Sequence, residues 1–73
     1  MTFKLLDTVV LTKDLPGHRL KQGYIGAIGD VHEPDAVEVE FVAASGKTIA
    51  LVTVPTVDVR PPMAGEMLTI RPV

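Results

Sequence analysis

In residues 36–41, apolar and acidic side chains alternate from Val37 onward, and this pattern constrains the fold more than any other. Val37, Val39 and Phe41 share one face of an extended chain, whereas Glu38 and Glu40 share the opposite face. Such two-residue alternation is typical of a β-strand with one buried and one solvated face. The chain therefore needs a sheet, because one strand cannot bury its apolar face alone.

Four further segments have the same extended character. They are rich in valine, isoleucine and threonine, whose branched side chains pack well on a pleated sheet. Turn-forming residues separate them, as expected for short strands joined by tight connections. The predicted strands, besides the alternating one, are Leu5–Leu11, Tyr24–Val31, Thr48–Val54 and Val57–Arg60.

The predicted strand Tyr24–Val31 contains Gly26 and Gly29, with Gly23 just before it. Its apolar residues lie three apart, which alone would favour a helix, but glycine inside a helix costs about 1 kcal/mol relative to alanine. Glycine within a strand instead marks a bulge or a sharp bend. We therefore expect a bend within this strand. Beyond the bend, the positions whose side chains face inward should shift by one residue.

The predicted strand Thr48–Val54 carries apolar residues on both of its faces. Ile49 and Leu51 share one face, and Ala50 and Val52 share the other. A strand without a polar face is typical of a sheet that is covered on both sides. We therefore expect this strand to be covered on both faces.

Residues 12–23 are polar and interrupted by a Pro-Gly pair, which predicts a long loop, and loops of this length are often functional. Shorter turns are expected at 32–35 and 43–47. One long early loop and five short strands predict an all-β fold, a small five-stranded SH3-like barrel over residues 1–62. An OB-type barrel is the alternative, but it usually adds a helix, and no helical pattern is present.

Residues 63–73 form a separate C-terminal tail in this interpretation. Met67–Arg71 has the composition of a sixth strand. Pairing with the barrel's own edge would protect an open ladder, whereas pairing with another chain would make an oligomer or a partner contact.

The chain has 73 residues and no cysteine, so disulfides and thiolate metal sites are excluded. A core of this size rarely supplies more than about 3–5 kcal/mol, and many small domains gain stability from a partner or from oligomerisation. Residues 1–7 lack the long apolar core of a signal peptide, and no stretch approaches the ~20 apolar residues of a membrane span. We therefore expect a cytoplasmic protein that does not contact a membrane.

Much of the chain resembles an uncharacterised prokaryotic family, domain of unknown function 4926. The resemblance covers roughly residues 5–61 and implies a small SH3-like barrel. The family has no assigned activity, so the resemblance implies no site residues. It rests on the segments Leu5–Pro16, Gly23–Ile28, Val37–Phe41, Gly46–Thr48 and Ala50–Pro55.

A more distant similarity links Gly23-x-x-Gly26-x-Ile28 to the KOW motif of ribosomal and transcription-factor barrels, which bind RNA or protein. A nucleic-acid interface would use the basic residues Lys13, Arg19 and Lys21 of the long loop, with Lys47. The net charge of −2 and the scarcity of aromatic residues for base stacking disfavour it. Nucleic-acid binding is therefore the alternative hypothesis.

The sequence offers little material for catalysis or metal binding. Ser45 is the only serine and lies in an expected turn, and the two histidines are His18 and His32. Glu38 and Glu40, about 7 Å apart on one strand face, are expected to be solubilising residues. We expect no catalytic residue, cofactor or small-molecule substrate, and no metal at His32 and the acidic residues that follow it.

Binding of a protein, or of a second copy, is the function that the sequence favours. SH3-like barrels bind peptides between their loops or along an open strand edge. A polyproline ligand is not expected, because its groove needs several aromatic residues. The partner could be encoded by a neighbouring gene, as for antitoxin or immunity proteins. This comparison is an analogy that rests on size and charge alone. The candidate contact residues are Leu15, Pro16, Arg19, Leu20, Lys21, Tyr24, Met67 and Leu68.

Overall fold

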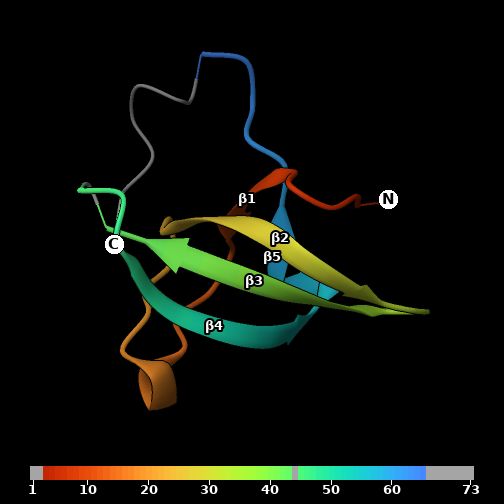
Figure 1. The fold of residues 1–73 in the computed structure, drawn as a ribbon, viewed down its shortest axis with the longest axis horizontal. Coiled ribbons are helices and arrows are strands. Elements are labelled where there is room, and N and C mark those ends of the chain that lie inside the picture. Colours follow the sequence, from red (N-terminus) through yellow and green to blue (C-terminus); the bar gives the residue numbers. More distant parts are fainter. Residues whose placement is uncertain (1–2, 44, 66–73) are drawn as a thin grey trace.

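The computed structural model describes residues 3–43 and 45–65, which form one antiparallel sheet of five strands (Figure 1). The order of the strands across the sheet is β4-β3-β2-β1-β5, so the last strand lies beside the first. Short 3-10 turns, η1 and η2, precede β2 and β5. The elements are β1 (Thr8–Leu11), η1 (Pro16–His18), β2 (Ile25–His32), β3 (Ala36–Val42), β4 (Thr48–Pro55), η2 (Thr56–Asp58) and β5 (Val59–Arg60).

This arrangement confirms the prediction of an all-β, five-stranded SH3-like fold. The sheet curls so that β5 returns to β1, but the strand order gives β4 and β5 no pairing with each other in the described residues. The barrel is therefore not closed, and β4 forms a long outer edge. The described part of the chain contains no helix long and apolar enough to cross a membrane.

The core lies on the concave side of the sheet. In β3 the alternating apolar residues are fully buried, while Glu38 is half-buried and Glu40 is exposed, as the sequence pattern predicts. Full burial of one such side chain stabilises the fold by about 1.5–3 kcal/mol relative to exposure. Every strand contributes to the core, whose buried residues are Phe3, Val9, Leu11, Leu20, Ile28, Val37, Val39, Phe41, Val52, Val54 and Val59.

The bend predicted within β2 is confirmed. The register of β2 against β3 shifts between Ile28 and Asp30, which leaves Gly29 as the extra residue of a bulge. Because the bulge changes the alternation, Ile28 and Val31 both pack on the core although they are three positions apart.

The first strand is shorter than predicted, because residues 4–7 form a turn. The Lys4 backbone N–H donates to Asp7 Oδ2 at 2.9 Å, and the Asp7 N–H donates to the Lys4 carbonyl at 3.1 Å. Leu6 adopts a left-handed φ of 70°, which no strand residue adopts. Leu5 and Leu6 are consequently exposed, and β1 begins at Thr8.

Two further predictions about the strands are wrong. Val57 and Asp58 belong to η2, and β5 contains only Val59–Arg60. In addition, β4 is not covered on both faces. Because no second layer packs on the convex face of the sheet in the described residues, Ile49 and Leu51 remain 51% and 57% exposed there. The predicted sixth strand, with Met67 and Leu68, lies outside the described residues.

Candidate functional site

The long connection between β1 and β2, residues 12–24, is called here the first loop. It is folded rather than extended. Leu15 and Leu20 pair their backbones in both directions, with N–H to carbonyl distances of 2.8 and 3.1 Å, and η1 forms the turn between them. Arg19 ends η1 with a left-handed φ of 58°. The loop tip is therefore held by its own backbone hydrogen bonds.

The first loop is also fixed to the barrel. The Leu20 side chain is only 1% exposed and belongs to the core. The Gln22 N–H donates to Asp14 Oδ1 at 2.8 Å, and the Gly23 N–H donates to the Leu11 carbonyl of β1 at 2.8 Å. Gly23 has a φ of 91°, a conformation that glycine adopts readily.

These constraints shape an open hollow of about 290 Å³ on the first loop. Buried Leu20 forms its floor and exposed Pro16 part of its wall. Arg19 and Lys21 supply positive charge, and the carboxylate of Asp14 completes the lining. The structure thus brings together four of the residues that the sequence nominated, and it adds Asp14.

The other nominated residues have different positions. Leu15 and Tyr24 are partly buried and pack against the core, so their side chains help to support the loop. Leu20 is a core residue, so at most a small part of its side chain faces the hollow. Met67 and Leu68 lie outside the described residues.

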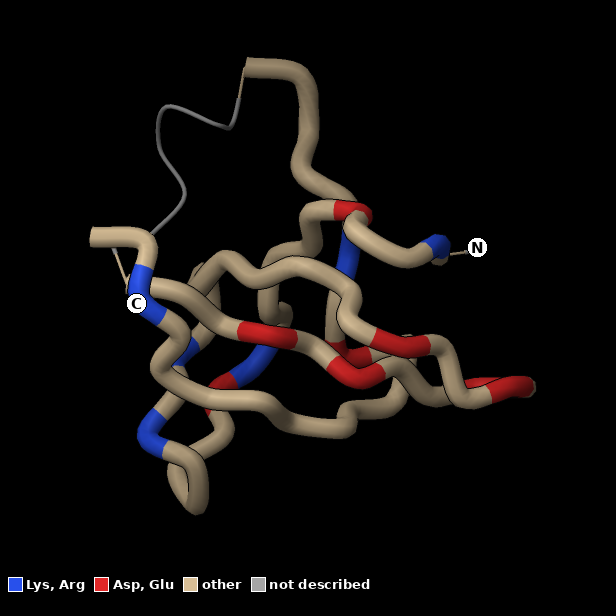
Figure 2. Tube along the Cα trace, viewed as in Figure 1, with Lys and Arg blue, Asp and Glu red and all other residues tan. Residues whose placement is uncertain are grey.

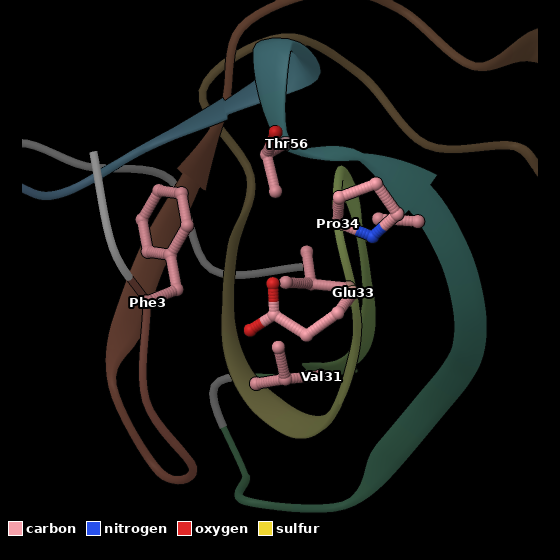
Figure 3. Close-up of a pocket in the computed structure, with 7 residues that line it drawn as sticks. Phe3, Val31, Glu33, Pro34 and Thr56 are labelled. Atoms are coloured by element: carbon pink, nitrogen blue, oxygen red, sulfur yellow. The ribbon is translucent and has the colours of Figure 1, made fainter.

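A second, smaller hollow of about 140 Å³ lies between the N-terminal segment, the turn from β2 to β3, and the end of β4. Figure 3 shows the Glu33 side chain in this hollow, with the Phe3 ring on one side and Thr56 on another. Glu33 is the one ionisable residue among the described residues that line it. A single exposed carboxylate gives no acid–base pair.

The residues considered for catalysis or metal binding are not brought together. His18 lies in the first loop and His32 at the end of β2, and these segments are at opposite ends of the molecule in Figure 1. Ser45 Oγ accepts a hydrogen bond from the Lys47 N–H at 3.4 Å, in keeping with the predicted turn. Across residues 3–43 and 45–65 there is no buried charged side chain and no metal-binding group of three or more His, Asp or Glu.

Charge is distributed unevenly over the molecule. Figure 2 shows acidic segments along β2, β3 and the turn between them, and basic segments in the first loop and in the hairpin before β4. The first loop contributes Lys13, Arg19 and Lys21 against a single acidic residue, Asp14. The hollow on the first loop therefore has a positive surround, although the net charge of the chain is −2.

The outer edge of β4 is a candidate surface that the sequence does not reveal directly. Ile49 and Leu51 belong to a convex face whose neighbouring residues on β3 are acidic, since Leu51 pairs with Glu40. Knowledge of that pairing would have identified the exposed face. Paired residues lie on the same face of a sheet, so a face that carries glutamates on β3 is also solvated on β4. The pairing itself is not evident from the composition of β4.

Comparison with known proteins places this architecture in a family. The model of a domain of unknown function, DUF4926, matches residues 5–61, which span β1 to β5 and include the first loop. No curated protein and no solved structure matches the chain. The match covers more than half of the chain and confirms the resemblance inferred from its segments.

Proposed function

We propose that the chain, which belongs to the DUF4926 family of unknown function, is a non-enzymatic module that binds another protein through its first loop. The observation that carries this proposal is the preformed hollow of about 290 Å³ at Pro16, Arg19, Leu20 and Lys21. Loops fixed on a rigid scaffold are common sites of recognition.

The rigidity of the first loop supports a role in binding. The paired backbones of Leu15 and Leu20 and the bond from Gln22 to Asp14 hold the hollow open without a ligand. A surface that is ordered before binding loses less conformational entropy when the partner docks. The backbone of the loop therefore loses little conformational entropy when its exposed side chains contact a partner.

The lining of the hollow indicates the chemistry of the partner. Pro16 and the floor at Leu20 suit one apolar side chain, and Arg19 and Lys21 suit a neighbouring carboxylate. The Asp14 carboxylate already accepts the Gln22 N–H, which offsets part of its charge. The partner is accordingly a protein segment that combines an apolar residue with acidic ones.

A protein is favoured over a nucleic acid for two reasons. Exposed acidic residues lie along β2 and β3 and would repel a phosphate backbone that extended beyond the loop. Tyr24 is the aromatic residue of the first loop that could stack on a base, and it is partly buried against the core. Nucleic-acid binding is therefore an alternative outcome of the test below.

The test is affinity capture from the host with the tagged full chain, followed by binding of the purified partner. Arg19→Glu and Lys21→Glu each reverse one charge beside the hollow, and Lys4→Glu is the matched control on an exposed lysine elsewhere. We expect each loop variant to weaken binding of the partner at least about tenfold, a loss of about 1.4 kcal/mol, and the control to bind like the wild type.

Two outcomes would contradict the proposal. One is equal binding by all three variants, which would place the contact away from the first loop. The other is salt-dependent binding of RNA or DNA, lost with the loop variants, in the absence of any protein partner.

A further inference from the structure

The outer edge of β4 is an open ladder. It runs from Thr48 to Pro55, and within the described residues it pairs with β3 on one side only. Long apolar edges invite pairing with another strand, and proteins usually protect them with charged residues or prolines. Here Lys47 precedes the strand, a bulge at Ile49 interrupts its start, and Pro55 is its last residue. The segment Ala50–Val54 between them carries none of these protecting features.

We propose that two copies of the chain associate through antiparallel pairing of their β4 strands about a two-fold axis. This inference concerns a surface separate from the first loop, so it does not depend on the proposed function.

The hydrogen bonds at one end of the strand show which backbone groups face outward. The Thr56 N–H donates to the Asp35 carbonyl at 2.8 Å, so these two residues form a hydrogen-bonded pair. Such pairs alternate along an antiparallel ladder, which makes Val52 with Val39 a hydrogen-bonded pair too. Leu51 and Thr53 therefore direct their N–H and carbonyl groups away from β3.

This alternation fits a second copy. With the two-fold axis at Val52, Leu51 of each copy lies opposite Thr53 of the other. The outward N–H and carbonyl groups of both residues are then hydrogen-bonded at once. The backbone N–H and carbonyl groups of Val52 face β3 and stay paired with it. Pairing of two copies therefore requires no rearrangement of the barrel.

The charges around β4 select the antiparallel orientation. No residue from Thr48 to Pro55 is charged, so nothing on the strand itself repels an identical copy. Lys47 precedes the strand, whereas exposed Glu33 and Asp35 lie beside its other end, where Ala36 pairs with Pro55. Antiparallel pairing brings the basic end of one copy to the acidic end of the other, and parallel pairing would join like charges.

Exposed apolar residues lie along β4 and just beyond its end. Ile49 and Leu51 project from β4, and Val57, which is 81% exposed, follows its end. Pairing covers part of each, but one strand edge buries less than the ~800 Å² per partner of a standard stable interface. We therefore expect a weak dimer. Assembly stops there, because the opposite edge of the sheet is β5, with only two residues.

The experiment measures mass by sedimentation velocity over a range of concentrations of the full chain. Leu51→Lys is compared with Leu5→Lys, because Leu5 is 60% exposed and Leu51 is 57% exposed. The wild type and Leu5→Lys should shift from monomer to dimer as concentration rises, whereas Leu51→Lys should stay monomeric. Thermal unfolding of each variant checks that it is folded.

A charge exchange tests the orientation. Lys47→Glu and Asp35→Lys should each weaken the dimer, and the double variant should restore it toward the wild type. Failure of the double variant to recover would overturn the antiparallel register.

A wild type that stays monomeric, or a Leu51→Lys variant that dimerises equally, would overturn the inference. In a monomer, slow exchange of the Leu51 and Thr53 amides would assign the edge to another segment of the same chain. Arg19→Glu should dimerise like the wild type, so loss of dimerisation and loss of partner binding are separate results.

Discussion

Among single residues, Gly26 illustrates how closely β2 approaches β3. A Cβ atom at this position would lie 2.6 Å from Val39 Cγ1 and 2.9 Å from the Glu40 carbonyl oxygen. The carbonyl belongs to the backbone of β3 and cannot move without disturbing the sheet. We predict that Gly26→Ala lowers the free energy of unfolding by about 1–3 kcal/mol, as measured by chemical denaturation.

Gly29, three residues along the same strand, provides the control. A Cβ atom there would lie 3.7 Å from Glu38 Oε1, an ordinary van der Waals distance. Gly29→Ala should therefore change the free energy of unfolding by less than about 1 kcal/mol. Equal destabilisation by the two variants would show that the close approach at Gly26 is not the cause.

Leu20 is the second informative residue, because the sequence assigns it to a polar loop and the structure places it in the core. We predict that Leu20→Ala lowers the free energy of unfolding by about 2–5 kcal/mol, since the lost methyl groups leave a cavity under the first loop. Leu5→Ala, at an exposed position, should cost less than about 0.5 kcal/mol. Similar losses for both variants would contradict the anchoring role of Leu20.

At the scale of elements, the sequence pattern within a strand predicted those features of the strand that depend on its own residues. The alternation of residues 36–41 predicted β3 and its buried face, because a two-residue period leaves only one assignment of faces. The glycines of β2 predicted its bulge, because glycine within a strand often marks a bulge or a bend. Both signals lie within the element that they describe.

The sequence-based predictions that were wrong concern features that depend on contacts with other parts of the chain. Whether a face of β4 is covered depends on what packs on the sheet, so the apolar faces of residues 48–54 did not reveal that one of them is exposed. The turn of residues 4–7 depends on the Asp7 carboxylate, which accepts the Lys4 N–H, and not on propensity. The sequence identified the first loop and named four residues that line the hollow, but it indicated neither the hollow itself nor the burial of Leu20.

At the scale of the whole molecule, the open barrel has one long edge and a core that is small. The chain has no disulfide, so packing within one sheet must supply most of its stability. Under these conditions, the proposed association of folded copies would raise stability measurably, because a partner that binds only the folded state stabilises it by mass action.

The dimer inferred above therefore predicts a melting temperature that rises with protein concentration. The wild type and Leu5→Lys should melt at higher temperature as concentration increases, because dimerisation draws the equilibrium toward folded chains. Leu51→Lys should melt at one temperature throughout, because a charge on the convex face of β4 blocks pairing. Differential scanning calorimetry measures this directly. An equal rise for Leu51→Lys would mean that β4 is not the surface that couples folding to association.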